Sequence, residues 1–587
     1  MWECIAMGPR LERSNRPKQR SAGNVAAAYL ALLADRGVDY LFGNAGTDFA
    51  PLIEAYAQSA QTGVAVPRAI LATHENLAVA MAHGYGMVSR RVPAVMVHVS
   101  VGTANMVCAA LNAARENVAI LLTAGRSPLT ETGLLGSRDG YIHWAQEMYD
   151  QAGMIREIVK WDYELRNAEQ LTTVVDRALA IAATEPRGPV YLSLPREVLA
   201  APVSDFEPPS PSRLSAAAPP APDADAIAAA AHTLAQATRP LIVTTNAGRD
   251  AAAFKALTQF TERFAIPLVQ HRPRYLSLPS SHPMSLGFDP ARLVQKADAI
   301  LVLESDVPWI PSRAAPRPEC KVIQCGFDPL FARYPIRGFP CDVAITGSSV
   351  ATLAALTAAL ADALDEQSIA LRRRWIKDER DALRAAWKTA LDAATRRTPL
   401  DPAWVSHCVD RAKEPHCIVI NEYTLFLEQC TFESPDVYFG SSSASGLGWG
   451  AGAALGAKLA RPESPVMAVL GDGAYMFCNP AAVHHASALH ELPVLFVVMN
   501  NGMWGAVERS TLAMYPDGLA ARSNEPPFVA LRKLPAFEKI CEAAGGYGER
   551  VEDPGTLPGA LQRAMSVVKD ERRQALLNVI CGPGGTA

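Results

Sequence analysis

Short apolar runs alternate with amphipathic stretches in three separate parts of the chain. The runs have the length of buried strands, and the longer stretches between them have the pattern of helices. The clearest predicted strands lie at residues 40–42, 94–98, 119–123, 241–244, 299–303, 322–324, 465–470 and 492–499. Helices that alternate with short buried strands predict parallel sheets covered on both faces. The pattern therefore predicts an α/β protein built from doubly wound parallel-sheet domains.

Two connecting segments divide the chain into three predicted domains. Residues 202–222 are rich in Pro, Ser and Ala and have the composition of a linker. Residues 365–397 form a charged helical stretch, which we interpret as a second connector. We predict domains at residues 21–201, 223–364 and 401–582. The first twenty residues mix charges with prolines, and we expect them to form a tail outside these domains.

The composition narrows the classes of function. The chain has 587 residues, of which 49% are hydrophobic and 19% are charged, and its formal net charge is −4. This balance provides no cationic surface for nucleic acid or for an anionic membrane. No run approaches the ~20 apolar residues that span a bilayer, and residues 1–20 lack the apolar core of a signal peptide. The 11 cysteines form no Cys-x-x-Cys pair, so we expect a cytoplasmic protein with reduced thiols.

Two short motifs follow predicted strands in the last third of the chain. They are Gly471-Asp472-Gly473 and Asn500-Asn501-Gly502, with 26 residues, 474 through 499, between them. The segment between them has the pattern of a helix over residues 479–490, for which Asn479 is a suitable N-cap. A strand-helix-strand crossover makes the two strands parallel neighbours. Both motifs are therefore expected at the sheet edge where open α/β proteins bind ligands.

The residue types in these motifs suit a metal ion and phosphate groups. Asp472 supplies a carboxylate oxygen, Asn501 an amide oxygen and Met503 a main-chain carbonyl oxygen. Hard oxygen ligands of this kind suit octahedral Mg²⁺, which completes its shell with phosphates. The glycines allow backbone N–H groups to approach a diphosphate. We predict a metal-diphosphate clamp, although two ordinary turns after strands are the alternative interpretation.

The spacing of the two motifs resembles the thiamine diphosphate (ThDP) signature, in which Gly-Asp-Gly is followed by Asn-Asn at this distance. Residues 42–47, Phe-Gly-Asn-Ala-Gly-Thr, and the pair His74-Glu75 extend the resemblance to nearly the whole chain. In this order the chain is similar to the decarboxylase and acetohydroxyacid synthase superfamily, and several local motifs are similar to benzoylformate decarboxylases. The resemblance implies a pyrimidine-binding first domain, a middle domain and a diphosphate-binding third domain.

The resemblance also implies a role for individual residues. Glu75 would hydrogen-bond a pyrimidine nitrogen of ThDP and so favour the imino form of the coenzyme. His98 and His282 fall where benzoylformate decarboxylases have their two active-site histidines, and Thr47 falls where these enzymes contact the substrate carboxylate. The implied contacts of the diphosphate, the coenzyme bend and the metal are Thr424, Ser445, Leu447, Gly471, Gly473, Ala474, Asn501 and Met503, together with Asp472.

Each histidine also has a structural interpretation, because a His at a strand end is as often a satisfied polar residue as a catalyst. Glu508 is a weaker candidate for a catalytic acid. Pyruvate decarboxylases have a catalytic Glu six residues after the metal-binding Asn, which is position 507 here. Glu508 is one residue further along, roughly 100° around a helix from that position. Three departures bear on affinity and substrate: Ala45 replaces a proline, Ala474 replaces a serine, and Glu75 lies in His-Glu-Asn where benzoylformate decarboxylases have Gln-Glu-Ala. Residues 142–147, followed by Lys160-Trp161, resemble the synthases instead, so the subfamily stays open.

The expected activity is carbon–carbon bond cleavage or formation on a 2-oxo acid, with ThDP and Mg²⁺ as cofactors. We rank a decarboxylase first, an acetolactate synthase-like carboligase second and a 2-hydroxyacyl-CoA lyase third. A catalytically silent ThDP-fold protein is the non-enzyme alternative, and a nicotinamide or flavin oxidoreductase lacks its phosphate loop. FAD near residues 305–309 is left open but not favoured. The resemblance implies a homodimer as the minimal active unit, because Glu75 would face the diphosphate domain of its neighbour, and a homotetramer is common in the family.

Overall fold

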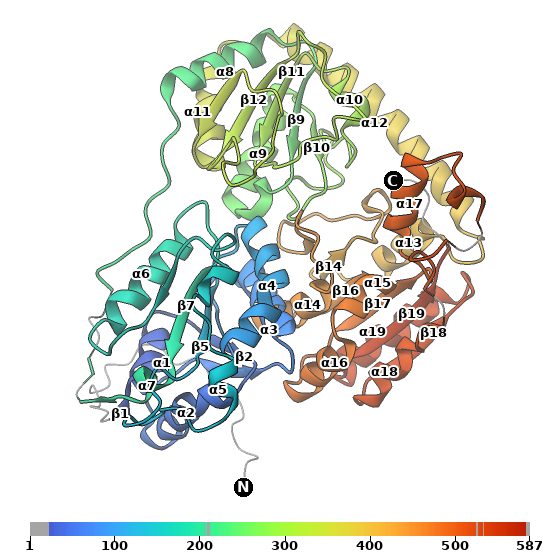
Figure 1. Ribbon diagram of the computed structural model, residues 1–587. Coiled ribbons are helices and arrows are strands. Elements are labelled where there is room, and N and C mark those ends of the chain that lie inside the picture. The colour runs from blue at the N-terminus through green and yellow to red at the C-terminus, as the bar shows by residue number, and fades with distance from the viewer. Residues whose placement is uncertain are drawn as a thin grey trace.

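The chain folds into three α/β domains around parallel sheets of six, five and six strands (Figure 1). The computed structural model describes residues 23–582 except 205, 208, 209, 211, 524, 525 and 532, and the tail expected over residues 1–20 lies outside this range. In Figure 1 the first domain is blue to teal, the middle domain is green to yellow, and the third is orange to red. The predicted fold class is confirmed.

The first sheet has the order β3-β2-β4-β5-β7-β6, and all its strands run parallel. Its central strands are buried on both faces, which explains their continuous apolar runs. The strands are β2 (Tyr40–Gly43), β3 (Arg68–Leu71), β4 (Ala94–Val97), β5 (Leu121–Arg126), β6 (Asp162–Glu164) and β7 (Val190–Pro195). The helices are α1 (Val25–Asp35), α2 (Ala50–Thr62), α3 (Glu75–Ser89), α4 (Val99–Arg115), α5 (Ile142–Ala145), α6 (Leu171–Ala183) and α7 (Arg196–Ala200).

The third sheet repeats this topology with the order β15-β14-β16-β17-β19-β18. In both domains the strand order, counted from the first strand of the sheet, is second, first, third, fourth, sixth, fifth. The strands are β14 (Ile418–Glu422), β15 (Tyr438–Gly440), β16 (Val466–Gly471), β17 (Leu495–Asn500), β18 (Tyr547–Val551) and β19 (Ala575–Ile580). The helices are α13 (Pro402–Ala412), α14 (Gly450–Ala460), α15 (Asp472–Phe477), α16 (Pro480–Leu489), α17 (Gly505–Met514), α18 (Phe537–Ala543) and α19 (Leu557–Asp570).

The chain order reverses direction in each of these sheets next to its first strand. In the first domain the reversal lies between β2 and β4, and in the third domain it lies between β14 and β16. At such a point two successive loops diverge to opposite faces of the sheet and leave a crevice at the carboxyl ends of the strands. Each domain therefore offers one natural place for a ligand.

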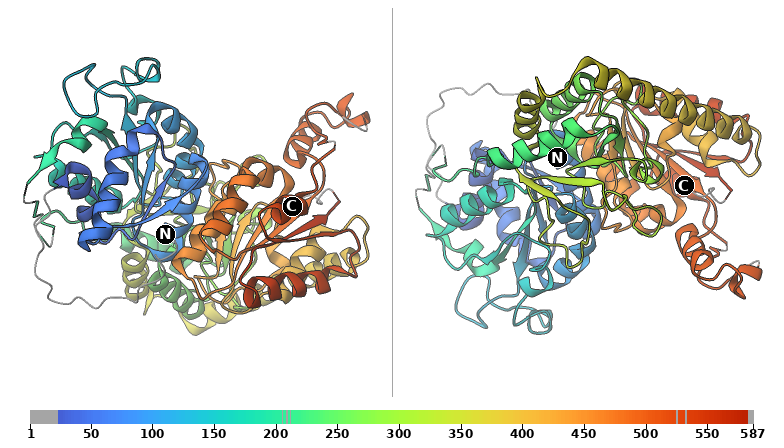
Figure 2. Two further views of the ribbon diagram at one scale, coloured as in Figure 1. Left: turned by 90° about the horizontal axis from the view of Figure 1, so that it is seen from below. Right: turned by 90° about the horizontal axis from the view of Figure 1, so that it is seen from above.

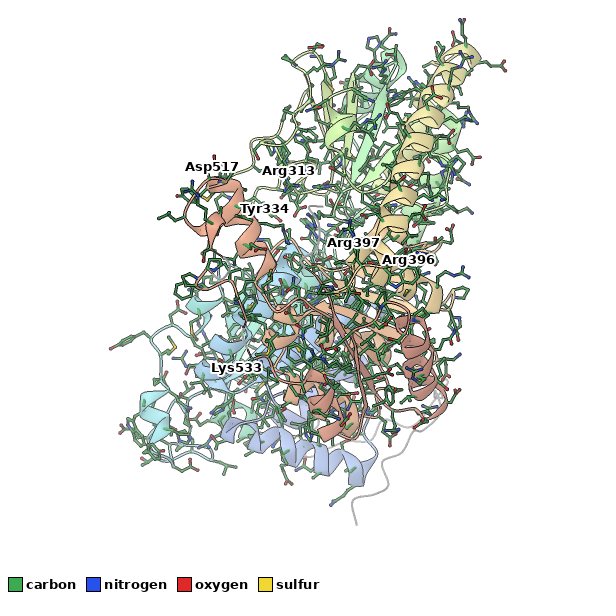
Figure 3. All side chains as sticks on the ribbon, turned by 90° about the vertical axis from the view of Figure 1, so that its right-hand side faces the viewer. Arg313, Tyr334, Arg396, Arg397, Asp517 and Lys533 are labelled. Atoms are coloured by element: carbon green, nitrogen blue, oxygen red, sulfur yellow. The ribbon has the colours of Figure 1, made fainter. Side chains whose placement is uncertain are left out.

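The middle sheet has five parallel strands in the order β10-β9-β11-β12-β13. A 29-residue helix, α12 (Glu366–Ala394), then runs along this domain toward the third one, and Arg396 and Arg397 follow its end (Figure 3). The strands are β9 (Pro240–Thr244), β10 (Leu268–Gln270), β11 (Ala299–Leu303), β12 (Lys321–Gly326) and β13 (Val343–Thr346). The helices are α8 (Ala224–Gln236), α9 (Ala251–Phe264), α10 (Ala291–Val294) and α11 (Ser349–Leu360).

Helices α3 and α14 join the first and third domains through glycine contacts. A Cβ atom at Gly84 would lie 2.1 Å from the carbonyl oxygen of Ala453, and one at Gly456 would lie 1.9 Å from that of Met81. Both glycines are required by space, because a larger residue would meet main-chain atoms that cannot move aside. The two helices share one buried apolar core with both sheets.

The connection from β16 to β17 differs in part from the expected single helix. The motif residue Asp472 begins a separate helix, α15, and α16 follows it. Asn479 occupies the N-cap position of α16, but its left-handed backbone (φ 56°) leaves no side-chain capping bond. The two strands are parallel neighbours as predicted.

The domain boundaries remain a prediction, with one detail added by the structure. Strand β8 (Pro202–Val203) pairs with β1 (Gly23–Asn24), just past the predicted boundary at residue 201. Beyond the third sheet, the segment that contains α17 and η5 (Ala520–Arg522) projects from the body of its domain (Figure 2). In the described part of the chain, no helix combines the length and apolar character that a membrane span needs.

Candidate active site

One carboxylate holds the two motifs of the third domain together. Strands β16 and β17 pair in parallel register, so the loops that follow them lie side by side. Asp472 Oδ1 accepts a hydrogen bond from the N–H of Gly473 at 2.9 Å, and its Oδ2 accepts one from the N–H of Gly502 at 2.8 Å. Asn501 Oδ1 accepts the N–H of Met503 at 3.0 Å. The structure therefore brings together the three predicted metal ligands, Asp472, Asn501 and Met503.

Asp472 is a buried carboxylate without a cationic side chain. It is 4% exposed, and among the described residues only burial and backbone N–H groups, not a Lys, Arg or His side chain, act on its charge. Burial raises the pKa of its carboxyl above the ordinary value, although backbone N–H groups oppose this shift. A buried carboxylate of this kind is stabilised by a cation.

The loop that contains Ser445 and Leu447 is held by two residues that the sequence analysis did not assign to the site. Asn112, on α4 of the first domain, donates its amide to the Gly446 carbonyl at 2.8 Å and accepts the Gly446 N–H at 3.0 Å. Glu422 accepts the N–H groups of Gly448 at 2.9 Å and Gly450 at 2.7 Å. Burial raises the pKa of Glu422 to about 7. Ser445 itself has a left-handed backbone (φ 56°). Asn112 and Glu422 hold the loop just after this residue.

A second cluster lies in the first domain, at the carboxyl ends of β2, β3 and β4. Glu75 is the first residue of α3, is 7% exposed, and accepts a hydrogen bond from Asn105 Nδ2 at 3.0 Å. His98 Nδ1 lies 2.6 Å from Asp48 Oδ1. The hydrogen bond with Asp48 raises the pKa of His98, and the charge of Glu75 adds to the effect. The structure thus brings Glu75 and His98 into one electrostatic cluster.

Asp48, Asn105 and Gln146 are members of this cluster that the sequence analysis did not propose. Gln146 Nε2 lies 3.4 Å from His98 Nε2, on the opposite edge of the ring from Asp48. Asp48 follows the predicted residue Thr47 directly, and Thr47 is exposed. The signal for Asp48 was its place in the glycine-bearing turn of residues 43–48. Asn105 gave no comparable signal.

His282 lies apart from these clusters within the chain. It follows β10 in the middle domain, and the charged groups that face it are Glu262, Arg380 and Glu433. Its Nδ1 accepts the N–H of Met284 at 3.2 Å, and burial lowers its pKa. The structure does not bring His282 to His98, so a joint role of the two histidines stays a prediction.

The comparisons with known proteins cover the same three domains. Residues 23–154 match the thiamine pyrophosphate enzyme N-terminal TPP binding domain, residues 227–356 the central domain, and residues 420–579 the C-terminal TPP binding domain. The chain belongs to the thiamine pyrophosphate enzyme family. Both clusters described above therefore lie in domains that bind this cofactor in the family.

Several curated relatives span almost the whole chain. Benzoylformate decarboxylase of Pseudomonas aeruginosa is 27% identical over 565 residues, which is 92% of this chain and 96% of the relative. The acetolactate synthase large subunit of Haemophilus influenzae is 25% identical over 558 residues, which is 91% of each chain. The fold is similar to the Rhodococcus jostii thiamine diphosphate-dependent 4-hydroxybenzoylformate decarboxylase, with a TM-score of 0.75, 21% identity, and coverage of 95% of this chain and 99% of that one.

The residues of this thiamine pyrophosphate enzyme fit the cofactor and its metal. The Thr424 hydroxyl is buried without a hydrogen-bond partner, and a Cβ at Gly471 would lie 3.4 Å from Thr424 Cγ2, so the two predicted phosphate contacts are neighbours. A Cβ at Gly473 would lie 2.3 Å from the Trp504 ring, so only glycine fits this turn. An orphan hydroxyl and a cation-free carboxylate are the groups that a diphosphate and Mg²⁺ would satisfy.

Ala474 lies in α15 and Leu447 in the segment between β15 and α14, and their predicted roles stay predictions. The described residues contain no group of three or more His, Cys, Asp and Glu side chains suited to a metal ion. The predicted set contains one carboxylate, one amide and one carbonyl and does not depend on such a group. When bound, ThDP supplies the electron sink for chemistry at a carbonyl carbon.

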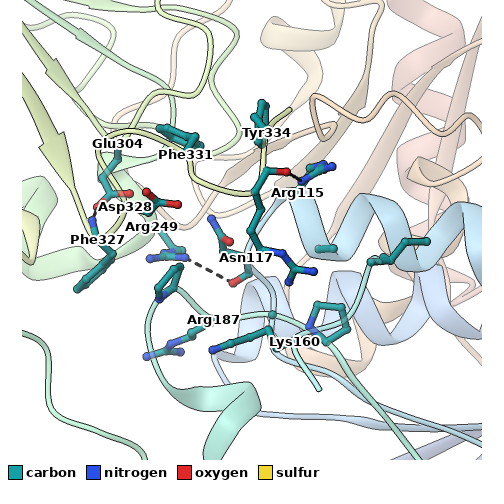
Figure 4. A pocket seen from close by; sticks show the side chains of 16 residues that line it. Arg115, Asn117, Lys160, Arg187, Arg249, Glu304, Phe327, Asp328, Phe331 and Tyr334 are labelled. Atoms are coloured by element: carbon teal, nitrogen blue, oxygen red, sulfur yellow. Dashed lines mark hydrogen bonds between the residues drawn. The ribbon is translucent and has the colours of Figure 1, made fainter. Parts of the chain in front are cut away.

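A cavity of about 390 Å³ lies between the first and middle domains (Figure 4). Burial lowers the pKa of Lys160 to about 8 and raises that of Glu304 to about 7. Its charged lining residues are Arg115, Lys160, Arg187, Arg249, Glu304, Asp328 and Arg333. It borders residues 305–309, where the sequence left FAD open, but Asp306 of that segment is already paired with Arg274 at 2.6 Å. FAD binding stays a prediction that the cofactor content of the protein can test.

Proposed function

We propose that this protein is a ThDP- and Mg²⁺-dependent decarboxylase of a 2-oxo acid. The observation that carries the proposal is the cluster of Glu75 and His98, two titratable groups at the carboxyl edge of the first sheet, in a chain whose third domain carries the Asp472 clamp. Decarboxylases among the relatives, including a probable 2-ketoarginine decarboxylase that is 28% identical over 518 residues, support this reaction class.

Each cluster has a separate task in the proposed reaction. Asp472, Asn501 and Met503 would hold the metal, and the buried Thr424 hydroxyl would bind a phosphate oxygen. Glu75 would hold a proton on its carboxyl toward the pyrimidine ring, in a pocket where Asn105 orients it. His98 would move a proton to or from the substrate, because its ring is partly exposed beside Glu75. Thr47 would contact the substrate carboxylate.

A carboligase remains the second candidate, because acetolactate synthases also match the chain over nearly its whole length. Both reactions begin with the loss of CO₂. They differ in what then bonds to the carbon from which CO₂ has left. A proton gives an aldehyde, whereas a second carbonyl compound gives a larger product. A CO₂-release screen of aliphatic and aromatic 2-oxo acids, with and without an aldehyde acceptor, separates them.

We also propose the homodimer as the minimal active unit. Large apolar side chains are exposed in residues 129–149, the segment that contains Gln146, and such surfaces mark contact sites. The exposed residues are Leu129, Leu134, Leu135, Tyr141, Trp144 and Tyr149. Light scattering of the purified protein tests this proposal, and a stable, active monomer would refute it.

The decisive variant is Glu75→Gln. It should retain ThDP, measured as thiochrome fluorescence after release, but lose about 10²–10⁴-fold in the rate of CO₂ release, the usual contribution of a proton-transfer group. Glu54→Gln removes an exposed carboxylate of the same domain and should change neither quantity. Full activity of Glu75→Gln would remove Glu75 from the mechanism. Purified protein that neither contains nor binds ThDP would refute the proposed function altogether.

A further inference from the structure

The turn that carries His98 has an unusual backbone. Strand β4 ends at Val97, and α4 begins at Val99, whose φ is +34°. A positive φ is strained for a β-branched residue, and such strain persists where the surrounding structure holds it in place. Asp48 provides that hold, because its Oδ2 accepts the Val99 N–H at 3.3 Å while its Oδ1 lies 2.6 Å from His98 Nδ1.

Two glycines leave the space that this pair occupies. A Cβ at Gly46 would lie 2.1 Å from His98 Nδ1, and a Cβ at Gly125 would lie 1.7 Å from Asp48 Oδ2. Neither glycine has a positive φ, so their backbone conformations are open to other residues. Space, rather than conformational freedom, is the reason for glycine at both positions. Three separate segments of the first domain therefore form one socket for the Asp48–His98 pair.

The two edges of the imidazole ring have different surroundings. The Nδ1 edge faces Asp48, whose side chain is 3% exposed, whereas the His98 side chain is 16% exposed. The Nε2 edge faces the amide of Gln146. The other titratable groups that act on the ring are Glu75, from the start of α3, and His143, from α5. A carboxylate at Nδ1 requires the proton there, so proton exchange falls to Nε2, the edge that has only the long 3.4 Å contact with Gln146 Nε2.

We propose that Asp48 is a positioning residue that fixes the His98 ring with Nδ1–H directed at its carboxylate and so assigns proton exchange with the substrate to His98 Nε2. This inference rests on the proposed function. In that reaction the bond between the carbonyl carbon and the carboxylate breaks, CO₂ leaves, and the electron pair stays with the carbon that CO₂ has left. The Nε2–H of the imidazolium supplies the proton that takes the place of CO₂. The ring is then neutral, still bonded to Asp48 through Nδ1–H, and water returns the proton to Nε2.

The first test measures the titration of His98 itself and needs no substrate. Hydrogen–deuterium exchange at imidazole Cε1, followed by peptide mass spectrometry across pH, gives a midpoint for each histidine. In the wild-type protein the His98 midpoint should lie above 6.5 and that of His282 below 6.5. In Asp48→Asn the His98 midpoint should fall by about 1 pH unit, because the opposite charge is gone.

A control variant separates this effect from the general loss of a paired carboxylate in the same domain. Asp39 pairs with Arg91 and accepts a hydrogen bond from Tyr85 Oη just before β2, at the other end of the same sheet. Asp39→Asn should leave the His98 midpoint unchanged. An unchanged midpoint in folded Asp48→Asn overturns the proposal. If that variant does not fold, the wild-type protein still decides, because a His98 midpoint at or below that of His282 also overturns it.

The second test is kinetic and separates this inference from the proposed function. Asp48→Asn should lower kcat for CO₂ release about 100-fold while KM changes less than about threefold, since a misplaced proton donor affects the chemical step rather than binding. A shifted midpoint in a protein that releases CO₂ from no 2-oxo acid would refute the decarboxylase and retain the Asp48–His98 pair. Wild-type kcat in Asp48→Asn, with CO₂ release intact, would refute the positioning role and retain the decarboxylase.

Discussion

Replacing Asp472 by Asn tests the metal-diphosphate clamp with little change of shape. The amide oxygen can still accept one of the two N–H groups that Asp472 now holds, those of Gly473 and Gly502. The variant loses the negative charge, which is the strongest ligand that the predicted set offers to Mg²⁺. Without ligand, the variant also avoids burying a carboxylate that is only 4% exposed. We therefore expect it to fold and to fail in cofactor binding.

The expected effect is large enough for a thermal-shift assay. ThDP with Mg²⁺ at 100 times Kd stabilises the wild-type protein by about 2.7 kcal/mol. For a unit of about 180 residues, the size of the third domain, this corresponds to a shift of about 5–10 °C. Loss of a ligand to the metal should weaken binding at least about 100-fold. The same ligand concentration then stabilises the variant by no more than about 0.4 kcal/mol, or about 1 °C.

The assay compares wild type and Asp472→Asn, each without ligand, with ThDP plus Mg²⁺ and with ThDP plus EDTA. Asp517→Asn is the matched control, because Asp517 is an exposed carboxylate of the same domain, in the projecting segment (Figure 3). The control should show the full shift with Mg²⁺. A full shift in Asp472→Asn would refute the assignment of Asp472 to the metal, and a full shift in EDTA would refute the need for a divalent ion.

Two further predictions concern stability. Burial raises the pKa of Glu116 from 4.5 to about 8, so its contribution to stability is present below pH 4.5 and is lost as the pH rises to about 8. Glu116→Gln should therefore unfold at higher urea concentration than the wild type at pH 8 and show no such gain at pH 4.5. Gly456→Ala should reduce the free energy of unfolding by about 1–3 kcal/mol or more, because its Cβ would meet the Met81 carbonyl, whereas Gly338→Ala should change it little, since open space surrounds Gly338. A neutral result for Gly456→Ala in urea denaturation would contradict the close packing of α3 and α14.

The sequence could predict what depends on local pattern. The apolar runs of β4, β11, β16 and β17 are continuous because both faces of these strands are buried, so their type and place follow from composition. Parallel pairing of β16 and β17 then brings Asp472 and Asn501 together without any further information. The juxtaposition of the two motifs was predictable for this reason, whereas the metal itself stays a prediction.

Contacts between distant segments were not predictable in the same way. Asp48 and His98 are 50 positions apart, and Asn112 and Gly446 are 334 positions apart. Neither pair has a spacing that a periodic pattern would reveal. His282 is a different case, because a local motif suggested its role, whereas within the chain the charged groups that face it are Glu262, Arg380 and Glu433. Its role therefore stays a prediction. Local resemblance identifies the segment, but the packing of domains decides which side chains meet.

The arrangement of the two clusters follows from the repeated topology of the first and third domains. In each, a polar residue follows the third strand of the sheet in chain order, β4 or β16, which borders the point where the strand order reverses, so the same physical rule places His98 in one domain and Asp472 in the other. A cofactor held by both kinds of domain needs a fixed geometry between them, since small displacements of reacting groups cost rate. Glu75 begins α3, the helix whose Gly84 and partner Gly456 admit close main-chain contact with α14. The contact between α3 and α14 therefore also fixes the position of Glu75. A substitution that loosens this contact should reduce stability and catalysis together.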